Sequence, residues 1–209
     1  MGWFLAPLYD IAMKKTEAAC LGEWRSQLLS QAKGRVLEIG GGTGANLQYY
    51  QEGLERVVVT EPDPGMKRQL DEKFKSLGKS EFETVDASAE TLPFEDASFD
   101  TVVSTLVLCT VDDPVQSLQE VYRVLRPGGA MIFIEHVHAH DNPGRARWQR
   151  RLEPIWKTFA GGCHLTRDTL AMIEATGFAV DDVTRASIRK ALPVIRPSIR
   201  GVALKPRET

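Results

Sequence analysis

The stretch EIGGGTG, residues 38–44, is the part of the sequence that decides the fold. It completes the apolar run 35–39, which we predict to be a buried strand because the run is short and ends in glycines. Glycines allow a sharp turn and let a ligand approach the backbone closely. A helix that begins after such a turn presents free N–H groups at its amino end. We therefore expect a strand, a glycine turn and a helix starting within residues 45–51, arranged as a ligand-binding loop.

Strand and helix signals alternate outward from this turn. Pro64 suits the first turn of a helix that Gly78 ends, and Thr166 is expected to cap a later helix. Strands are predicted at residues 35–39, 56–60, 81–85, 100–104 and 130–135, and a terminal hairpin at 178–184 and 199–204. Helices are predicted at residues 64–77, 114–125 and 166–176, with one or two more within 9–32.

This alternation predicts an α/β fold. We expect one doubly wound, Rossmann-like sheet of seven strands, mainly parallel with an antiparallel last strand, and helices on both faces. Residues 1–209 are expected to form a single domain, with an N-terminal helical cap at 1–33. Residues 136–165, rich in Arg, Trp and His, are interpreted as a substrate-side insertion that is irregular or partly helical.

Composition and charge narrow the class of protein. The 209 residues suffice for one well-packed domain, and the net charge of -2 argues against general nucleic-acid binding. No apolar stretch approaches the roughly eighteen residues that a membrane span needs. Three cysteines without a CxxC pair or a Cys/His zinc spacing predict a cytoplasmic location and no metal site.

Two surface features allow more than one interpretation. The apolar segment 1–8 is expected to cover the core, and the alternatives are a shallow peripheral membrane contact or a substrate lid. The basic group at residues 145–151 is expected to be a solvated helix face, and the alternative is a contact with an anionic substrate or lipid surface.

The glycine turn fits two kinds of cofactor loop. Gly40, Gly42 and Ala45 satisfy the dinucleotide pattern G-x-G-x-x-G/A, and Glu61 follows about twenty residues later, as that pattern requires. Glu38, Gly40, Gly42 and residue 44 satisfy E-x-G-x-G-x-G, the loop of class I methyltransferases. For each glycine taken alone, a plain tight turn is the simpler explanation.

Further segments together resemble the class I methyltransferases. Glu61 ends the second strand, Asp86-Ala87 follows the third, and LPF at 92–94, SFD at 98–100 and RVLRPGG at 123–129 complete the pattern. The resemblance implies S-adenosyl-L-methionine as cofactor, its ammonium near Glu38 and its ribose hydroxyls on Glu61. The cofactor-binding residues it implies are Glu38, Gly40, Gly41, Gly42, Gly44, Asn46, Glu61, Pro62, Met66, Asp86, Ala87, Thr105 and Leu106.

Over nearly the whole chain, from about Pro7 to Lys205, the sequence is similar to the methyltransferase-like protein 7 family. The segments that carry this are TLVLC at 105–109, EHV at 135–137, EPIW at 153–156, GCHLTR at 162–167 and VIRPSI at 194–199. Animal members are thiol S-methyltransferases with an N-terminal membrane anchor. This chain shows no such anchor, and Glu61 stands where the family commonly has Asp.

The resemblance implies methyl transfer to a small-molecule acceptor, preferably a thiol. The alternatives are a quinone, an amine or a lipid headgroup as acceptor, and a cofactor-binding protein without catalysis. Open α/β sheets place their sites at the carboxyl ends of strands, which directs attention to the residues after the fourth and fifth strands. The candidates for catalysis are His136, His164 and Cys163, and those for a substrate pocket are Tyr9, Trp148, Trp156 and Phe159. In the competing interpretation, each histidine is a hydrogen-bonded structural residue and Cys163 packs as a small side chain. The aromatic residues then belong to the core or to a lid.

Overall fold

The computed structural model describes residues 6–78 and 80–207. Its core is a seven-stranded sheet in the order β3-β2-β1-β4-β5-β7-β6. The strands are β1 (Arg35–Ile39), β2 (Arg56–Thr60), β3 (Phe82–Val85), β4 (Phe99–Thr105), β5 (Leu125–His136), β6 (Ala179–Ser187) and β7 (Pro197–Leu204). The first five run parallel, and β7 pairs antiparallel with both β5 and β6. The predicted sheet, with its antiparallel last strand, is therefore confirmed.

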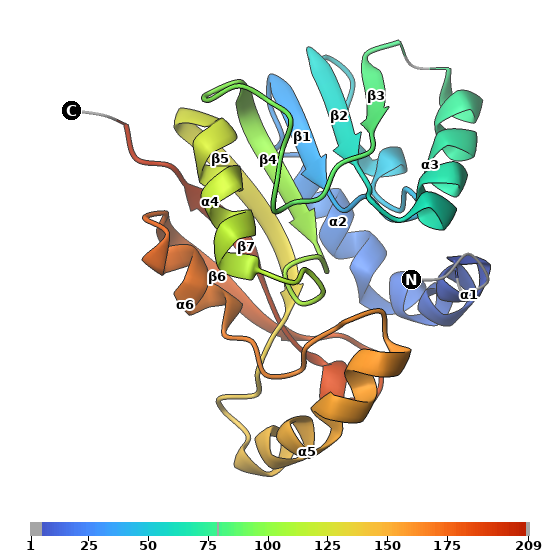
Figure 1. Cartoon of the computed structure of the whole chain (residues 1–209), viewed down its shortest axis with the longest axis vertical. Helices are drawn as coiled ribbons and strands as arrows, with labels where there is room; N and C mark the ends of the chain where they lie inside the picture. Colours follow the sequence, from blue (N-terminus) through green and yellow to red (C-terminus); the bar gives the residue numbers. More distant parts are fainter. Residues whose placement is uncertain (1–5, 79, 208–209) are drawn as a thin grey trace.

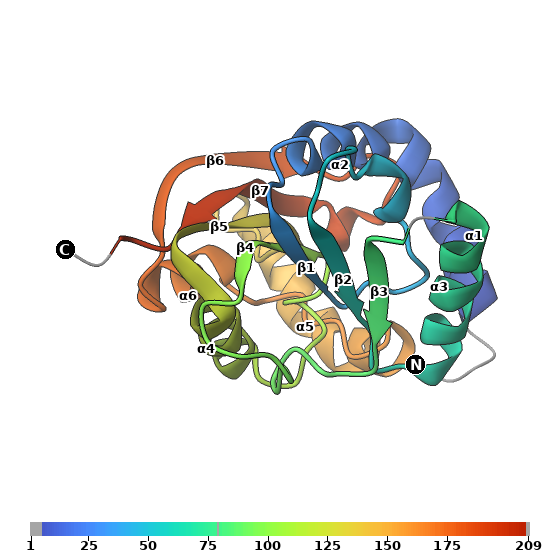
Figure 2. The ribbon, with the colours of Figure 1, turned by 90° about the horizontal axis from the view of Figure 1, so that it is seen from above.

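Helices cover both faces of the sheet, as the sequence predicted (Figure 1; Figure 2). The helices are α1 (Ala6–Thr16), α2 (Gly22–Leu29), α3 (Pro64–Leu77), α4 (Pro114–Val124), α5 (Pro143–Phe159) and α6 (Thr169–Ala175), of which α1 and α5 lie toward the carboxyl ends of the strands. Neighbouring strand residues point to opposite faces, so Val57 packs in the cluster that contains Leu29 of α2, and Val58 packs with Leu118 of α4. This double burial explains the apolar runs in the middle of β1 and β2.

Local signals set the helix ends. The Asp63 side chain accepts hydrogen bonds from the amides of Gly65 and Met66, and Gly78 ends α3 in the left-handed region at φ 61°. The cap of α6 is Asp168, which accepts from the Ala171 amide, and not Thr166 as predicted. Thr166 lies before the helix, and Asp168, directly before Thr169, caps it through the amide of the third helical residue.

One segment differs from the sequence-based expectation, and another agrees with its partly helical alternative. The helix expected within residues 45–51 is only a 3-10 turn over Leu47–Tyr49, because Tyr50 is extended. The segment expected to be irregular or partly helical contains α5, seventeen residues long, with Pro143 in its first turn and Pro154 inside. The cap of α5 is Asn142, whose side chain accepts from the Arg145 amide at 2.9 Å.

The N-terminal residues form one helical path across the sheet. A π-helical turn at Glu17–Leu21 joins α1 to α2, and Gly22 continues the helix without a break. Most of the apolar segment 1–8, interpreted as cover, lid or membrane contact, lies outside the described residues. Within the described part of the chain, none of the helices has the length and apolar character that a membrane crossing requires.

Candidate functional site

The carboxyl ends of the parallel strands meet at one edge of the sheet, on the side where α1 and α5 lie (Figure 1). The glycine turn leaves β1 at this edge with Gly40 and Gly42 both at φ 58° and Gly44 at φ 81°. Only glycine adopts these angles without strain. A Cβ added at Gly42 would meet nothing nearer than Met66 Sδ at 3.8 Å, whereas one at Gly41 would lie 2.2 Å from Val59 Cγ1. The turn therefore packs on the sheet through Gly41 and is open beside Gly42.

Glu61 connects the tip of β2 to the glycine turn. Its Oε2 accepts from the Gly42 amide at 2.8 Å, and its Oε1 accepts from the Asp63 amide at 2.9 Å. The side chain is buried, and this burial raises the pKa of Glu61 above its usual value. Each carboxylate oxygen has a second lone pair, so this group can still accept hydrogen bonds from a diol on a ligand.

Glu38, at the end of β1, is the centre of a buried polar network. Its Oε1 accepts from Asn46 Nδ2 at 2.9 Å, and its Oε2 accepts from the Tyr50 hydroxyl at 2.7 Å. Arg25 of α2 donates to Asn46 Oδ1 at 2.7 Å and also binds Glu17. Burial raises the pKa of Glu38 to about 7, although the hydrogen bonds and Arg25 oppose the rise. Sequence reasoning missed Arg25 and Tyr50, which precede and follow the motif.

The remaining residues expected at the cofactor lie along the same edge. Asn46 Nδ2 also donates to Thr105 Oγ1 at 3.1 Å, which links the tips of β1 and β4. Leu106 follows β4 at φ 59°, a left-handed conformation that is uncommon without glycine. Asp86 and Ala87 follow β3, and Pro62 follows Glu61 on the surface.

This edge fits a ligand like S-adenosylmethionine. The space beside Gly42 is a cradle that a single Cβ would narrow, and Met66 borders it. The carboxylates of Glu38 and Glu61 lie at the tips of neighbouring strands, where one suits an ammonium group and the other a ribose diol. These residues therefore fit the amino-acid and nucleoside parts of the cofactor.

A second group of polar side chains lies after β4 and β5. Cys163 Sγ is 3.9 Å from Nδ1 of His136, the last residue of β5, and Cys109 lies beside both. A hydrogen bond from the Cys109 thiol, with the imidazole beside it, lowers the pKa of Cys163, and the same pairing raises the pKa of Cys109. Cys109 was missing from the predicted site, although its place just after the fourth strand is a signal that could have found it.

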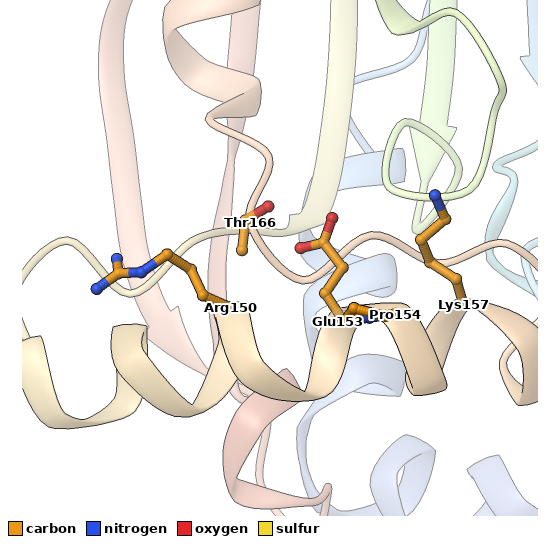
Figure 3. Close-up of a pocket in the computed structure, with 5 residues that line it drawn as sticks. All are labelled: Arg150, Glu153, Pro154, Lys157 and Thr166. Carbon is orange, nitrogen blue, oxygen red and sulfur yellow. The ribbon is translucent and has the colours of Figure 1, made fainter.

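The His164 side chain pairs with Glu153 and not with this group, although its amide donates to the Cys109 carbonyl. Its Nδ1 is 3.1 Å from Glu153 Oε1, in a pair that connects α5 to the following loop. Glu153 points from α5 toward Thr166 and lines a surface pocket with Arg150, Pro154 and Lys157 (Figure 3). This pocket lies on α5 and not at the strand tips.

The aromatic residues proposed to line a substrate pocket are dispersed. Trp148 and Phe159 are 56% and 77% exposed on α5. Trp156 is half-buried and lies beside Cys163, where a hydrogen bond from its side chain helps to lower the pKa of that thiol. Tyr9 belongs to α1, and its side chain lies outside the described part of the structure. The structure thus brings His136, Cys163 and Trp156 together, turns the His164 side chain to Glu153, and leaves Trp148 and Phe159 exposed to solvent.

Comparison with known proteins gives consistent results. Residues 37–133 match a family model described as a methyltransferase domain. The chain is 38% identical to thiol S-methyltransferase TMT1B of Rattus norvegicus, covering 97% of this chain and 85% of the relative. It is 38% identical to thiol S-methyltransferase TMT1A of Homo sapiens, covering 81% and 70%.

Solved structures share the fold at low sequence identity. The YcgJ protein of Bacillus subtilis aligns with a TM-score of 0.74 and 15% identity, over 90% of this chain and all (100%) of that chain. A SAM-dependent methyltransferase of Methanosarcina mazei aligns with a TM-score of 0.68 and 22% identity, over 85% of this chain and 95% of that chain. These likenesses support the fold described above.

Proposed function

Because the chain belongs to the thiol S-methyltransferase family and is an S-adenosylmethionine-dependent methyltransferase, we propose that it methylates the sulfur of a small thiol. The observation that carries the proposal is the similarity to thiol S-methyltransferases, which extends beyond the cofactor loop over nearly the whole chain. The segments after β4 and β5, where an acceptor is expected, lie within it.

We assign the cofactor to the edge formed by the glycine turn, Glu38 and Glu61. In this assignment the Glu38 carboxylate binds the ammonium group, the Glu61 carboxylate binds the ribose hydroxyls, and Gly42 leaves room for the ligand. When bound, S-adenosylmethionine supplies an electrophilic methyl group on a positively charged sulfur. Asn46 and Tyr50 hold Glu38 in place, and Arg25 holds Asn46.

We place the acceptor sulfur beside His136 and Cys163, at the ends of β5 and α5. A free thiol has a pKa near 8.5, so only a few per cent of it is ionised at neutral pH. His136 and Cys109 are 3% and 2% exposed, so this part of the protein excludes most water. Excluding water favours the step, because a thiolate and a sulfonium cancel their charges as they react. In this proposal His164, paired with Glu153, positions α5 and does not touch the acceptor.

The proposal includes the setting of the reaction. Cys20, Cys109 and Cys163 are free thiols, which supports a reducing, cytoplasmic compartment. The net charge of -2 supports a small molecule and not a nucleic acid as acceptor.

A panel of acceptors tests the proposal. The purified chain is incubated with S-adenosylmethionine and, in parallel, with an alkanethiol, hydrogen sulfide, a hydroquinone, a phenol and an amine. S-adenosylhomocysteine and the methylated product are then quantified. We expect S-adenosylhomocysteine and an equimolar methylated product, a thioether from the alkanethiol and methanethiol from hydrogen sulfide, and no product from the other acceptors. Turnover of the hydroquinone or the amine without turnover of any thiol would contradict the proposal, and cofactor binding without turnover would indicate a non-catalytic protein.

A further inference from the structure

Three potential metal ligands come together from distant parts of the chain. Cys109 lies in the turn after β4, His136 is the last residue of β5, and Cys163 lies in the loop after α5. One ligand atom of each lies within 4.8 Å of the other two, and Cys163 Sγ is 3.9 Å from His136 Nδ1. Cys163 is 27 residues from His136, outside the short spacings of zinc-binding sequence motifs. The three residues could therefore not be recognised as a group from the sequence.

The donor set suits a thiophilic divalent cation. Two thiolates and an imidazole are ligands that Zn²⁺ prefers, and no carboxylate belongs to the set, so Mg²⁺ and Ca²⁺ are poor candidates. Bonds of about 2.3 Å to sulfur and 2.0 Å to nitrogen place tetrahedral donors roughly 3.5–3.8 Å apart. The observed separations are close enough for small side-chain shifts to reach this geometry. Two thiolates also neutralise the cation, so burial of the complex leaves no net charge in the interior.

Surrounding hydrogen bonds hold the turn that carries Cys109. Arg167 donates to the carbonyls of Leu108 at 2.6 Å and Val111 at 2.7 Å, on either side of this cysteine. The His164 amide donates to the Cys109 carbonyl at 2.7 Å, which ties the loop of Cys163 to the same turn. Supporting contacts of this kind orient metal ligands before the metal arrives.

The β5 side of the site is fixed as well. Glu135 is fully buried, and its Oε1 accepts from the Ser104 hydroxyl at 2.7 Å and from the Val107 amide at 3.2 Å. This contact joins the end of β5, where His136 lies, to the turn that leads to Cys109. All three ligands are therefore carried by segments that the protein already holds together.

We propose that Cys109, His136 and Cys163 bind one thiophilic divalent cation, with Zn²⁺ as the test ion, and that the acceptor thiol is its fourth ligand. Binding of the cation releases the two cysteine protons to solvent. Binding of the acceptor displaces a water molecule and releases the thiol proton, so the sulfur becomes a thiolate without any oxidation or reduction. The fourth-ligand part of this inference rests on the proposed thiol methylation, whereas the metal site does not.

Cobalt titration tests the metal site. The full chain is stripped with a chelator, kept reduced with a phosphine, and titrated with Co²⁺ and then Zn²⁺. We expect one equivalent of Co²⁺ to give a thiolate-to-cobalt absorption band, and one equivalent of Zn²⁺ to abolish it. Cys163→Ser should weaken the band, since one thiolate remains, and should bind Zn²⁺ at least about 10-fold more weakly, since even loss of a supporting contact costs about 10- to 100-fold.

A matched variant controls for the loss of a thiol. Cys20 is buried in the described structure, and its Sγ accepts from the Arg189 amide at 3.2 Å, away from the cluster. Cys20→Ser should keep the band and the stoichiometry of the wild type. If Cys163→Ser fails to fold by circular dichroism, His136→Ala replaces it; this variant keeps both thiolates, so we expect a band at higher Co²⁺ concentrations and Zn²⁺ binding at least about 10-fold weaker than in the wild type. A wild-type protein that binds neither ion, or a folded ligand variant that binds as the wild type does, overturns the inference.

Addition of an alkanethiol to the cobalt-loaded protein tests the fourth ligand. We expect a stronger charge-transfer band from the additional thiolate, and an unchanged spectrum overturns this part. Stripped protein that methylates thiols at the full rate overturns the metal-assisted role while the proposed function stands. A protein that binds one Zn²⁺ but methylates no thiol refutes the proposed function and leaves the metal site intact.

Discussion

Substitution of Gly42 separates cofactor binding from folding. A Cβ there has space, since the nearest atom is Met66 Sδ at 3.8 Å, but φ is 58°. The left-handed conformation costs a non-glycine residue about 1–2 kcal/mol, so Gly42→Ala should fold with a modest loss of stability. The added methyl group would occupy the space that we assign to the cofactor. Overpacking costs about 1–3 kcal/mol, which corresponds to a rise in Kd of about 5- to 150-fold.

Two other glycines are matched controls for this experiment. Gly53 also has a positive φ, 87°, with nothing within 4 Å of an added Cβ, and it lies before β2, away from the site. Gly53→Ala should lose similar stability in urea unfolding and keep the wild-type Kd for S-adenosylmethionine in calorimetry. Gly41→Ala should be severely destabilised, because its Cβ would lie 2.2 Å from Val59 Cγ1. Wild-type affinity in Gly42→Ala, or equal weakening in Gly53→Ala, would refute the assignment of the turn.

Three further substitutions follow from the polar groups at the strand tips. Glu61→Ala removes charged hydrogen bonds worth about 1.5–3 kcal/mol, so Kd should rise about 10- to 150-fold by calorimetry; an unchanged Kd would exclude Glu61 from the site. Arg25→Ala leaves Asn46 Oδ1 without its buried donor, and urea unfolding should show a loss of about 1–3 kcal/mol, whereas wild-type stability would argue against the network. Burial raises the pKa of Glu38 from 4.5 to about 7, so its folded carboxyl holds a proton that the unfolded chain has released, and the contribution of this group to stability should fall by roughly 3 kcal/mol between pH 4.5 and 7. Glu38→Gln lacks this group, so the difference in unfolding free energy between the two proteins should change with pH by that amount; a constant difference would mean that the pKa is not raised.

The sheet could be predicted because its central strands β1, β2, β4 and β5 contain short apolar runs closed by turn signals. The order of the apolar runs limited the possible arrangements of the strands, because crossovers between parallel strands are right-handed. Pro64 and Gly78 indicated where the helix between the second and third strands begins and ends. The bounds of α5 could not be predicted because its sequence is polar and contains Pro154. Only Ala146 and Gln149 are buried in this helix, so it shows no clear apolar face. The sequence does indicate where α5 begins, because the capping residue Asn142 is followed directly by Pro143.

The candidate site also has one part that the sequence could predict and one part that it could not. The glycine turn and Glu61 could be assigned from spacing because strand ends and their loops are local features. The contacts of Arg25 with Asn46 and of Cys109 with Cys163 join residues far apart in the chain, and only the packed sheet brings them together. The spacing of the cysteines and histidines in the sequence argued against a metal site, because the three candidate ligands are also far apart in the chain.

The most direct test of the account is a crystal structure of the chain with S-adenosylhomocysteine. The account predicts that the ligand lies in the space beside Gly42, with its ribose hydroxyls on Glu61 and its ammonium group near Glu38. An empty strand edge, or a ligand bound elsewhere while the edge accepts a nicotinamide dinucleotide, would contradict it.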